Sequence, residues 1–409
     1  MSENKKLTPK IRFKGFTEDW EQRKLDKYLE QYTEVTKTNN QYPALTSSRK
    51  GIFFQTEYFA GNQIASENNI GYNIVPRNYF TYRHMSDDEI FHFNINDICD
   101  FGIVSTLYPV FTTKNNMDSK YLQYQLNYGK EFYNYSILQK QGGSRTYMYF
   151  AKLKELYLTI PSYKEQCKIS SILAEIDNLI TLHQRKYDKL VKIKSSLLEK
   201  MFPKNSSKIP EVRFKGFTED WEQRKVAEIG DNFSTGTLGY ADLCDDGKYK
   251  CVLYGDLYTK FNERILNVKS RTNKEGTKVE INDLLFPTST TVDSISLIAP
   301  SCVNQENIRV GGDLFGIRPY RNIDGNFVSY CINNFMPVKY SFAKQAQGLT
   351  IVHLQYNAIK NEELMIPTLD EQKKMSQLFV NIDNLITLHQ RKLDKLQNIK
   401  KSLLDKMFV

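Results

Sequence analysis

The 409-residue sequence contains little of what metal sites and disulfide frameworks require. It has only five histidines and six cysteines, namely Cys99, Cys167, Cys244, Cys251, Cys302 and Cys331. No two of these cysteines form a CxxC pair, and no histidine stands at zinc-finger spacing from such a pair. The pattern argues against a structural zinc or a disulfide framework and fits a reducing compartment.

Long apolar runs are also missing. No stretch of 18 consecutive apolar residues occurs, and the opening letters MSENKKLTPKIRF lack the apolar region of a secretory signal. We therefore expect a soluble, cytoplasmic protein with no membrane partner.

Two motifs that carry chemistry are absent. A methyltransferase that modifies amino groups of flipped bases needs Asn or Asp followed by Pro-Pro and an aromatic residue, and no two prolines are adjacent. A P-loop needs GxxxxGK[ST], but neither Gly129-Lys130 nor Gly247-Lys248 is followed by Ser or Thr. The chain is therefore not expected to transfer methyl groups or to hydrolyse ATP.

One acidic group superficially resembles a nuclease site. Asp370, Glu371 and Lys373 lie in PTLDEQKK, but the corresponding segment PSYKEQCK keeps only the glutamate. We interpret Glu371 as a helix cap and expect no metal and no catalytic site in this chain.

What the sequence does contain is enough apolar material for two or three domains and a mild excess of positive charge. It is 40% hydrophobic and 13% aromatic, and 56 Lys and Arg exceed 47 Asp and Glu to give a net charge of +9. That excess suits a polyanionic partner such as nucleic acid.

The dominant feature is an internal duplication. RFKGFTEDWEQRK at Arg12–Lys24 returns unchanged 201 residues later at Arg213–Lys225, and IDNLITLHQRK at Ile176–Lys186 returns 206 residues later at Ile382–Lys392. We call the first of these repeats the frame. The chain then reads as a first domain at 1–161, a helix at 162–203, a second domain at 204–367 and a helix at 368–409.

Both long helices are predicted from their start signals and their apolar spacing. Ser162 with Glu165, and Thr368 with Glu371, form capping boxes after a proline. Apolar residues then recur every three or four positions, close to a heptad seam. The seam comprises Ile169, Leu173, Ile176, Ile180, His183, Tyr187, Leu190, Ile193, Leu197 and Met201, and then Met375, Phe379, Ile382, Ile386, His389, Leu393, Leu396, Ile399, Leu403 and Met407.

About 40 residues at a rise of 1.5 Å give rods of roughly 60 Å, whose apolar stripes need a partner. The repeat makes the other helix the nearest candidate, running antiparallel, and a partner subunit is the alternative. The antiparallel pairing would bring His183 and His389 together near its midpoint. Half-exposed, hydrogen-bonded imidazoles are the plain interpretation, and a pH-sensitive pair is the other.

The stretches between frame and helix, about 25–161 and 226–367, differ in sequence but both show an α+β pattern. We call them the first and second variable domains. Tyr121, Tyr124, Tyr128 and Phe132 have helical spacing, which favours core packing over base stacking. Hydroxyl-rich, cation-bearing loops and nearby arginines are the candidates for contacts to DNA, although solvated loops share that composition. The candidates are Ser47, Ser48, Arg49, Lys50, Arg77, Arg83, Ser144, Arg145, Thr288, Ser289, Thr290 and Thr291.

RFKGFTEDWEQRKL before each variable domain, with IPSYKEQCKISSILAEIDNLI or IPTLDEQKKMSQLFVNIDNLI after it, resembles the conserved regions of a type I restriction-modification specificity subunit. The resemblance covers essentially the whole chain. It implies two target recognition domains of α/β type on an antiparallel helical spacer with pseudo-twofold symmetry, reading the two halves of a split double-stranded DNA target.

The same resemblance implies two methyltransferase subunits and two restriction subunits as partners, with S-adenosylmethionine, ATP and Mg²⁺ bound by those partners. The frame aromatics Phe13, Phe16, Trp20, Phe214, Phe217 and Trp221 would pack against the helix ends, while the charged frame residues would contact the methyltransferase. A stand-alone methyltransferase or nuclease, and a coiled-coil scaffold without a DNA role, are the competing hypotheses.

Overall fold

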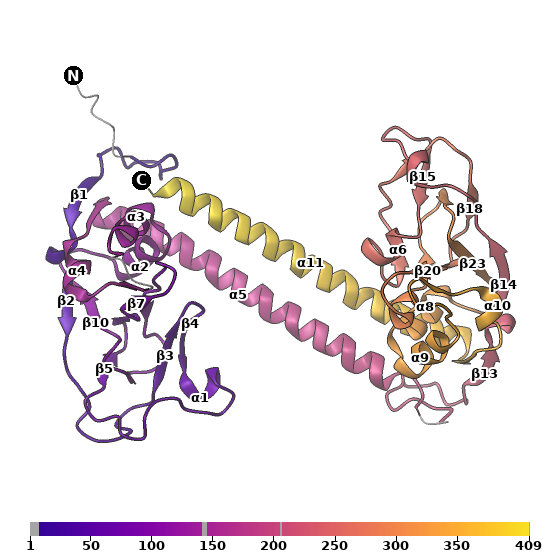
Figure 1. Ribbon diagram of the computed structural model, residues 1–409, viewed down its shortest axis with the longest axis horizontal. Coiled ribbons are helices and arrows are strands. Elements are labelled where there is room, and N and C mark those ends of the chain that lie inside the picture. Colours follow the sequence, from indigo (N-terminus) through magenta and orange to yellow (C-terminus); the bar gives the residue numbers. More distant parts are fainter. Residues whose placement is uncertain (1–7, 141–144, 205–206, 409) are drawn as a thin grey trace. The chain divides into compact units, whose positions relative to one another are not determined.

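The computed structural model describes residues 8–140, 145–204 and 207–408. It confirms the α+β class with two long helices and an internal repeat (Figure 1). The chain divides into two compact units, Met1–Gln184 with Arg391–Val409, and Arg185–Gln390. Each unit therefore contains one variable domain and a segment of both long helices. Within the described ranges, no helix combines the length and the apolarity that crossing a membrane requires.

The long helices are α5, Tyr163–Lys200, and α11, Leu369–Met407. In the first unit, the Lys400 Nζ of α11 lies 2.6 Å from Asp177 Oδ1 of α5, and Met407 shares a core with Ile169 and Leu173. Residue numbers rise along one helix segment as they fall along the other, so the two segments run in opposite directions. The second unit repeats this arrangement, with Lys194 Nζ 2.8 Å from Asp383 Oδ1.

The apolar seam is buried mainly near the helix ends that pack against the variable domains, and also at Leu393 near the middle of α11. Ile169, Leu173, Ile176, Phe379, Ile382 and Leu393 are buried, together with Met201, Met375 and Met407. Ile193 and Ile399, which the spacing places in the seam, are instead 38% exposed. The lysine that follows each isoleucine turns inward instead, because it pairs with a carboxylate of the other helix. Lys194 pairs with Asp383, and Lys400 pairs with Asp177.

In the first variable domain, small antiparallel sheets surround an aromatic core. The largest has the order β2-β10-β6-β8, and the others pair β1 with β12, β3 with β4, β5 with β9 and β11 with β7. The bounds are β1 Glu21–Lys24, β2 Leu29–Tyr32, β3 Leu45–Ser48, β4 Gly51–Phe54, β5 Asn73–Pro76, β6 Phe80–Thr81, β7 Met85–Ser86, β8 Asn94–Ile95, β9 Phe101–Val104, β10 Val110–Thr113, β11 Thr146–Tyr147 and β12 Tyr157–Ile160. The short helices are α1 Gln55–Tyr58 and α4 Phe150–Glu155.

The second variable domain has larger sheets, ordered β14-β23-β19-β21-β16 and β17-β15-β22-β18, beside the pairs β13-β25 and β20-β24. The bounds are β13 Glu222–Lys225, β14 Gly230–Ser234, β15 Tyr249–Val252, β16 Arg264–Ile265, β17 Arg271–Thr272, β18 Thr277–Val279, β19 Leu284–Pro287, β20 Ser289–Thr290, β21 Ser301–Val303, β22 Ile308–Val310, β23 Leu314–Pro319, β24 Val352–His353 and β25 Glu363–Ile366. The short helices are α6 Asp256–Thr259, α7 Ser294–Leu297 and α10 Tyr356–Ile359.

A helix pair recurs in both variable domains despite their different sequences. It consists of α2, Ser119–Tyr128, with α3, Lys130–Leu138, and of α8, Gly325–Asn334, with α9, Met336–Lys344. Asp118 and Asp324 cap α2 and α8 by accepting hydrogen bonds from backbone N–H groups three residues on. Tyr121, Tyr124 and Phe132 are buried, as their helical spacing predicts, whereas Tyr128 is 49% exposed.

Candidate nucleic-acid interface

The frame closes each unit by joining its domain to its long helix. Its turn places Gly15 and Gly216 at φ of +98° and +99°, a conformation that favours glycine. Trp20 and Trp221 follow and are almost fully buried. The letters EQRK then form β1 and β13, which pair antiparallel with β12 and β25, the strands that lead into α5 and α11. Through this strand pairing, each frame links the start of its variable domain to the strand that leads into the long helix.

A buried ion pair fixes the same junction. Arg12 donates from Nε and Nη2 to both carboxylate oxygens of Glu165, at 2.7 and 2.8 Å, and Arg213 binds Glu371 at the same distances. Both glutamates are 1% exposed, and this hydrogen bonding raises the pKa of each arginine. The sequence assigns these glutamates to helix capping. The structure corrects this, because both oxygens of each carboxylate accept from a frame arginine.

The residue that precedes each frame contacts the last turn of the other repeat's helix. The backbone N–H of Ile11 donates to the Lys406 carbonyl, and that of Val212 donates to the Lys200 carbonyl, both at 3.0 Å. Lys168 lies over the rings of Phe13 and Phe16. The equivalent Lys374 lies over Phe217, with Nζ 4.8 Å from the ring centre. Phe214 packs against the core that contains Trp221.

Four of the predicted DNA-contacting residues of the first variable domain gather at one hollow of about 260 Å³. They are Ser47, Ser48, Arg49 and Arg83, and His92 and Tyr108 also line the hollow. Ser48 pairs with Gly51 across the β3-β4 hairpin, so Arg49 and Lys50 form its exposed tip.

Hydrogen bonds anchor the end of β3 that leads into the hairpin tip. Asn94 donates to Ser47 Oγ at 2.8 Å and to the Ser48 carbonyl at 2.9 Å, and Ser47 Oγ donates to the Thr81 carbonyl. These hydrogen bonds hold Ser47 and Ser48 in place, while Arg49 and Lys50 at the tip are exposed.

A run of three acids, of which Asp87 lines the hollow, pairs with cations from separate segments. Asp87 accepts from Arg145 Nε at 2.8 Å, Asp88 pairs with Arg49, and Glu89 pairs with Lys140. The hydrogen bond from Arg49 lowers the pKa of Asp88 to about 2. Pairing of β11 with β7 sets Arg145 beside Asp87. Ser144, also a predicted contact, lies outside the described residues.

His92 lines the hollow in surroundings that disfavour a charged imidazole. Its burial, together with the nearby Arg49, lowers its pKa below the ordinary value. The cations nearest the hollow are therefore Arg49 and Arg83, which line it, and Lys50 at the hairpin tip.

Arg77 lies apart from this cluster. Its Nε donates to Asp100 at 2.9 Å and its Nη1 donates to the Asp97 carbonyl at 2.8 Å. These contacts hold the guanidinium against the segment that joins β8 to β9.

Three stacked rings form a further surface that the sequence interpretation missed. His84 stacks on Tyr149 at 5.0 Å between ring centres, and Tyr147 stacks on Tyr149 at 5.8 Å. Tyr147 and Tyr149 are 37% and 50% exposed, between the buried Thr146, Met148 and Phe150. This alternation is visible in RTYMYF and could have identified the two tyrosines as outward-facing. Such rings suit stacking on bases or sugars.

The second variable domain has a larger hollow of about 770 Å³, lined by the predicted residues Ser289, Thr290 and Thr291. Tyr258 donates from its hydroxyl to the Ser289 carbonyl at 3.0 Å and so fixes this strand. Thr288 is absent from the lining, and its N–H donates to the Asp313 carbonyl. Lys339 of α9, which the sequence interpretation missed, also lines this hollow. Burial lowers the pKa of its ammonium group, although the charge of Glu263 acts in the opposite direction.

The chain thus has two domains of different sequence, each attached to a copy of the same frame. A comparison with models of protein families identifies this arrangement. The model of the type I restriction modification DNA specificity domain matches residues 17–192 and 218–398. The chain therefore belongs to this family and is a type I restriction-modification specificity subunit with two DNA specificity domains.

Individual relatives agree. The chain is 25% identical over 306 residues to a putative type I restriction enzyme MjaX specificity subunit of Methanocaldococcus jannaschii, covering 71% of this chain and 68% of the relative. It is also 25% identical over 335 residues to the MjaVIII specificity subunit of the same organism, covering 74% and 73%. The fold matches the crystal structure of a type I restriction-modification S subunit from M. genitalium, with a TM-score of 0.61, 14% identity, and 98% and 99% coverage.

Proposed function

We propose that this chain is the non-catalytic DNA-reading subunit of its restriction-modification complex, and that each variable domain reads one half of a split, asymmetric DNA target. The observation that carries the proposal is the contrast between an identical frame and unlike domains. Two copies of one DNA-reading surface would read the same bases twice, whereas two different hollows on one frame read two different half-sites.

In the first variable domain, the hairpin tip Arg49-Lys50 and Arg83 would contact phosphates or guanine edges, and the exposed tyrosines would stack. In the second, Ser289, Thr290 and Thr291 would supply hydroxyl contacts, with Lys339 as the cation. The ion pairs with Asp87 and Asp88 keep the arginine side chains ordered until phosphate replaces the carboxylates.

The repeated frames offer two equivalent surfaces, which supports docking of two copies of one methyltransferase subunit. Lys14, Glu18 and Asp19 are exposed on the first frame, as are Lys215, Glu219 and Asp220 on the second. Two restriction subunits would complete the assembly. S-adenosylmethionine, ATP and Mg²⁺ would be bound by these partners, since the sequence has neither the Pro-Pro motif nor a P-loop.

The decisive experiment maps methylated adenines in DNA from cells that express this chain with its methyltransferase subunit. We expect one motif made of two unlike halves around an unspecified gap. A palindromic or continuous motif would contradict the two-domain assignment. Methylation or cleavage by the purified chain alone would favour the enzyme hypothesis instead.

A further inference from the structure

Two lysines of the long helices occupy equivalent, mostly buried positions but have different surroundings. Lys194 of α5 and Lys400 of α11 are separated by the 206-residue repeat, and each side chain is 18% exposed. Lysine is rarely buried unless its charge is paired. The groups that contact each lysine therefore show which parts of the unit its charge connects.

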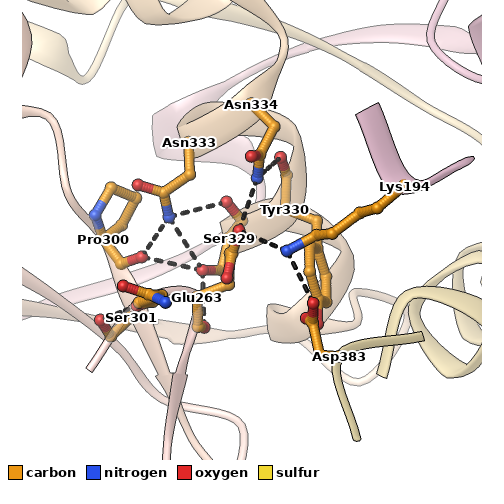
Figure 2. Close-up of polar contacts among 10 residues, drawn as sticks. Lys194, Glu263, Pro300, Ser301, Ser329, Tyr330, Asn333, Asn334 and Asp383 are labelled. Atoms are coloured by element: carbon orange, nitrogen blue, oxygen red, sulfur yellow. Dashed lines mark hydrogen bonds and ion pairs between the residues drawn. The ribbon is translucent and has the colours of Figure 1, made fainter. Parts of the chain in front are cut away.

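In the second unit, one ammonium group joins three elements (Figure 2). Lys194 Nζ lies 2.8 Å from Asp383 Oδ1 of α11 and 3.3 Å from Glu263 Oε1 of the variable domain. The Tyr330 hydroxyl of α8 donates to the other oxygen of Asp383. Burial disfavours the charged lysine, but the two carboxylates outweigh it and raise its pKa. We call these four residues the Lys194 cluster.

The Lys194 cluster continues into the wall of the large hollow. Asn334 Nδ2 donates to Glu263 Oε1 at 2.9 Å, and Ser329 Oγ donates to the Glu263 carbonyl at 2.7 Å. Glu263 and Asn334 line the hollow that Ser289, Thr290 and Thr291 also line. Hydrogen bonds and ion pairs therefore connect the wall of the candidate DNA-reading surface to both helix segments.

The first unit preserves the helix contacts but replaces the acid. Lys400 Nζ lies 2.6 Å from Asp177 Oδ1, and the Tyr124 hydroxyl donates to Asp177 Oδ2 at 2.7 Å. Tyr128, the counterpart of Asn334 in the repeat, stacks on Tyr124 and lies 4.9 Å from the ammonium. A cation–π contact thus takes the place of the carboxylate. In the second unit, an ion pair with Glu263 thus links the lysine to the wall of the hollow that Ser289, Thr290 and Thr291 line.

Resting on the function proposed above, we propose that the Lys194 cluster is a positioning site that sets how strictly the gap between the two half-sites is measured. Adding one base pair displaces a half-site by about 3.4 Å and turns it by roughly 34° about the DNA axis. A domain that tilts on its helices would tolerate that change. A buried charge network resists tilting, because any other geometry leaves a charge unpaired.

The test uses the complex of this chain with its methyltransferase subunit and duplexes that carry the mapped half-sites at the natural gap, or at a gap one base pair shorter or longer. The variants are Lys194→Met and the double variant Lys194→Met/Glu263→Gln, which also removes the carboxylate left unpaired. The control is Lys192→Met, an exposed lysine on the same helix. Binding of each duplex and the melting temperature of each complex are measured.

We expect the preference for the natural gap to fall by about tenfold in both Lys194 variants, which corresponds to about 1.4 kcal/mol of binding free energy. The double variant should recover most of the melting temperature without recovering the preference, and Lys192→Met should match the wild type. An unchanged preference, or one that returns together with stability in the double variant, would show a merely structural role and overturn the proposal. A wild-type complex that selects no two-part target would refute the proposed function itself, before any variant is compared.

Discussion

Arg77 and Arg83 are six residues apart, yet the fold gives them different surroundings. Arg83 is exposed at the rim of the first hollow, beside the hairpin tip that carries Arg49. Arg77 is held by the Asp100 carboxylate and the Asp97 carbonyl, both in the segment that joins β8 to β9. Composition and spacing do not distinguish the two arginines. A comparison of their variants therefore tests whether the hollow that Arg83 lines binds DNA.

We expect Arg83→Gln to weaken binding of the full target by roughly ten- to a hundredfold, because a charge-assisted hydrogen bond contributes about 1.5–3 kcal/mol. The slope of log affinity against log salt should fall by about 0.9 as one phosphate contact is lost. Arg77→Gln is the matched control and should leave both quantities unchanged. Salt titrations of binding measure this, and equal losses in both variants would count against the hollow.

At the level of elements, the frame and the start of each long helix form one structural joint. Strand pairing of β1 with β12 supplies backbone hydrogen bonds, and Arg12 with Glu165 adds a nearly buried ion pair. Removing the cation leaves Glu165, 1% exposed, without its partner in a poorly solvated site.

We expect Arg12→Met to lower the unfolding free energy of the first unit by about 3–5 kcal/mol, the usual cost of breaking a buried pair from one side. The chain has two tryptophans, so in a Trp221→Phe background urea unfolding followed by fluorescence reports on Trp20 and its unit. Arg23→Met, at an exposed pair with Glu21, should change stability by no more than about 0.5 kcal/mol. Similar losses in both variants would refute the special role of the Arg12 joint.

For the molecule as a whole, the proposed function makes the helix pair a ruler. Seven residues inserted after Gln184 and after Gln390 add about 10.5 Å to each helix and keep the apolar seam in phase. Methylation mapping should then show unchanged half-sites around a gap longer by up to about three base pairs, at about 3.4 Å each. Four-residue insertions at the same places break the phase of the seam and should abolish modification. A motif unchanged by the seven-residue insertions would contradict the ruler.

Several features could be predicted because they depend on local pattern. The two long helices follow from uninterrupted spacing of three and four, and the start of each follows a proline. Tyr121, Tyr124 and Phe132 follow from the same periodicity. The candidate site was predicted in part, since Ser47, Ser48, Arg49 and Arg83 line one hollow and Ser289, Thr290 and Thr291 line another. The expected meeting of His183 with His389 stays a prediction.

The remaining features depend on contacts between residues far apart in the chain. Glu165 looks like a helix cap until Arg12, 153 positions earlier, is placed against it. Ile193 and Ile399 fit the seam, yet a lysine beside each turns inward toward a carboxylate. Lys339 and His84 carry no signal in the sequence pattern, because the fold alone brings Lys339 to the larger hollow and His84 to the ring of Tyr149.

The sequence by itself determined the repeated plan, the α+β class and the resemblance to specificity subunits. It could do so because a duplicated frame and a heptad seam are patterns among residues that are close together in the chain. Tertiary structure alone decided which arginines meet a hollow, which acids pair with them and how each lysine is anchored. The physical reason is that burial and charge pairing depend on distance in space. A periodic pattern reports which face of a helix is apolar, but not which charge lies opposite.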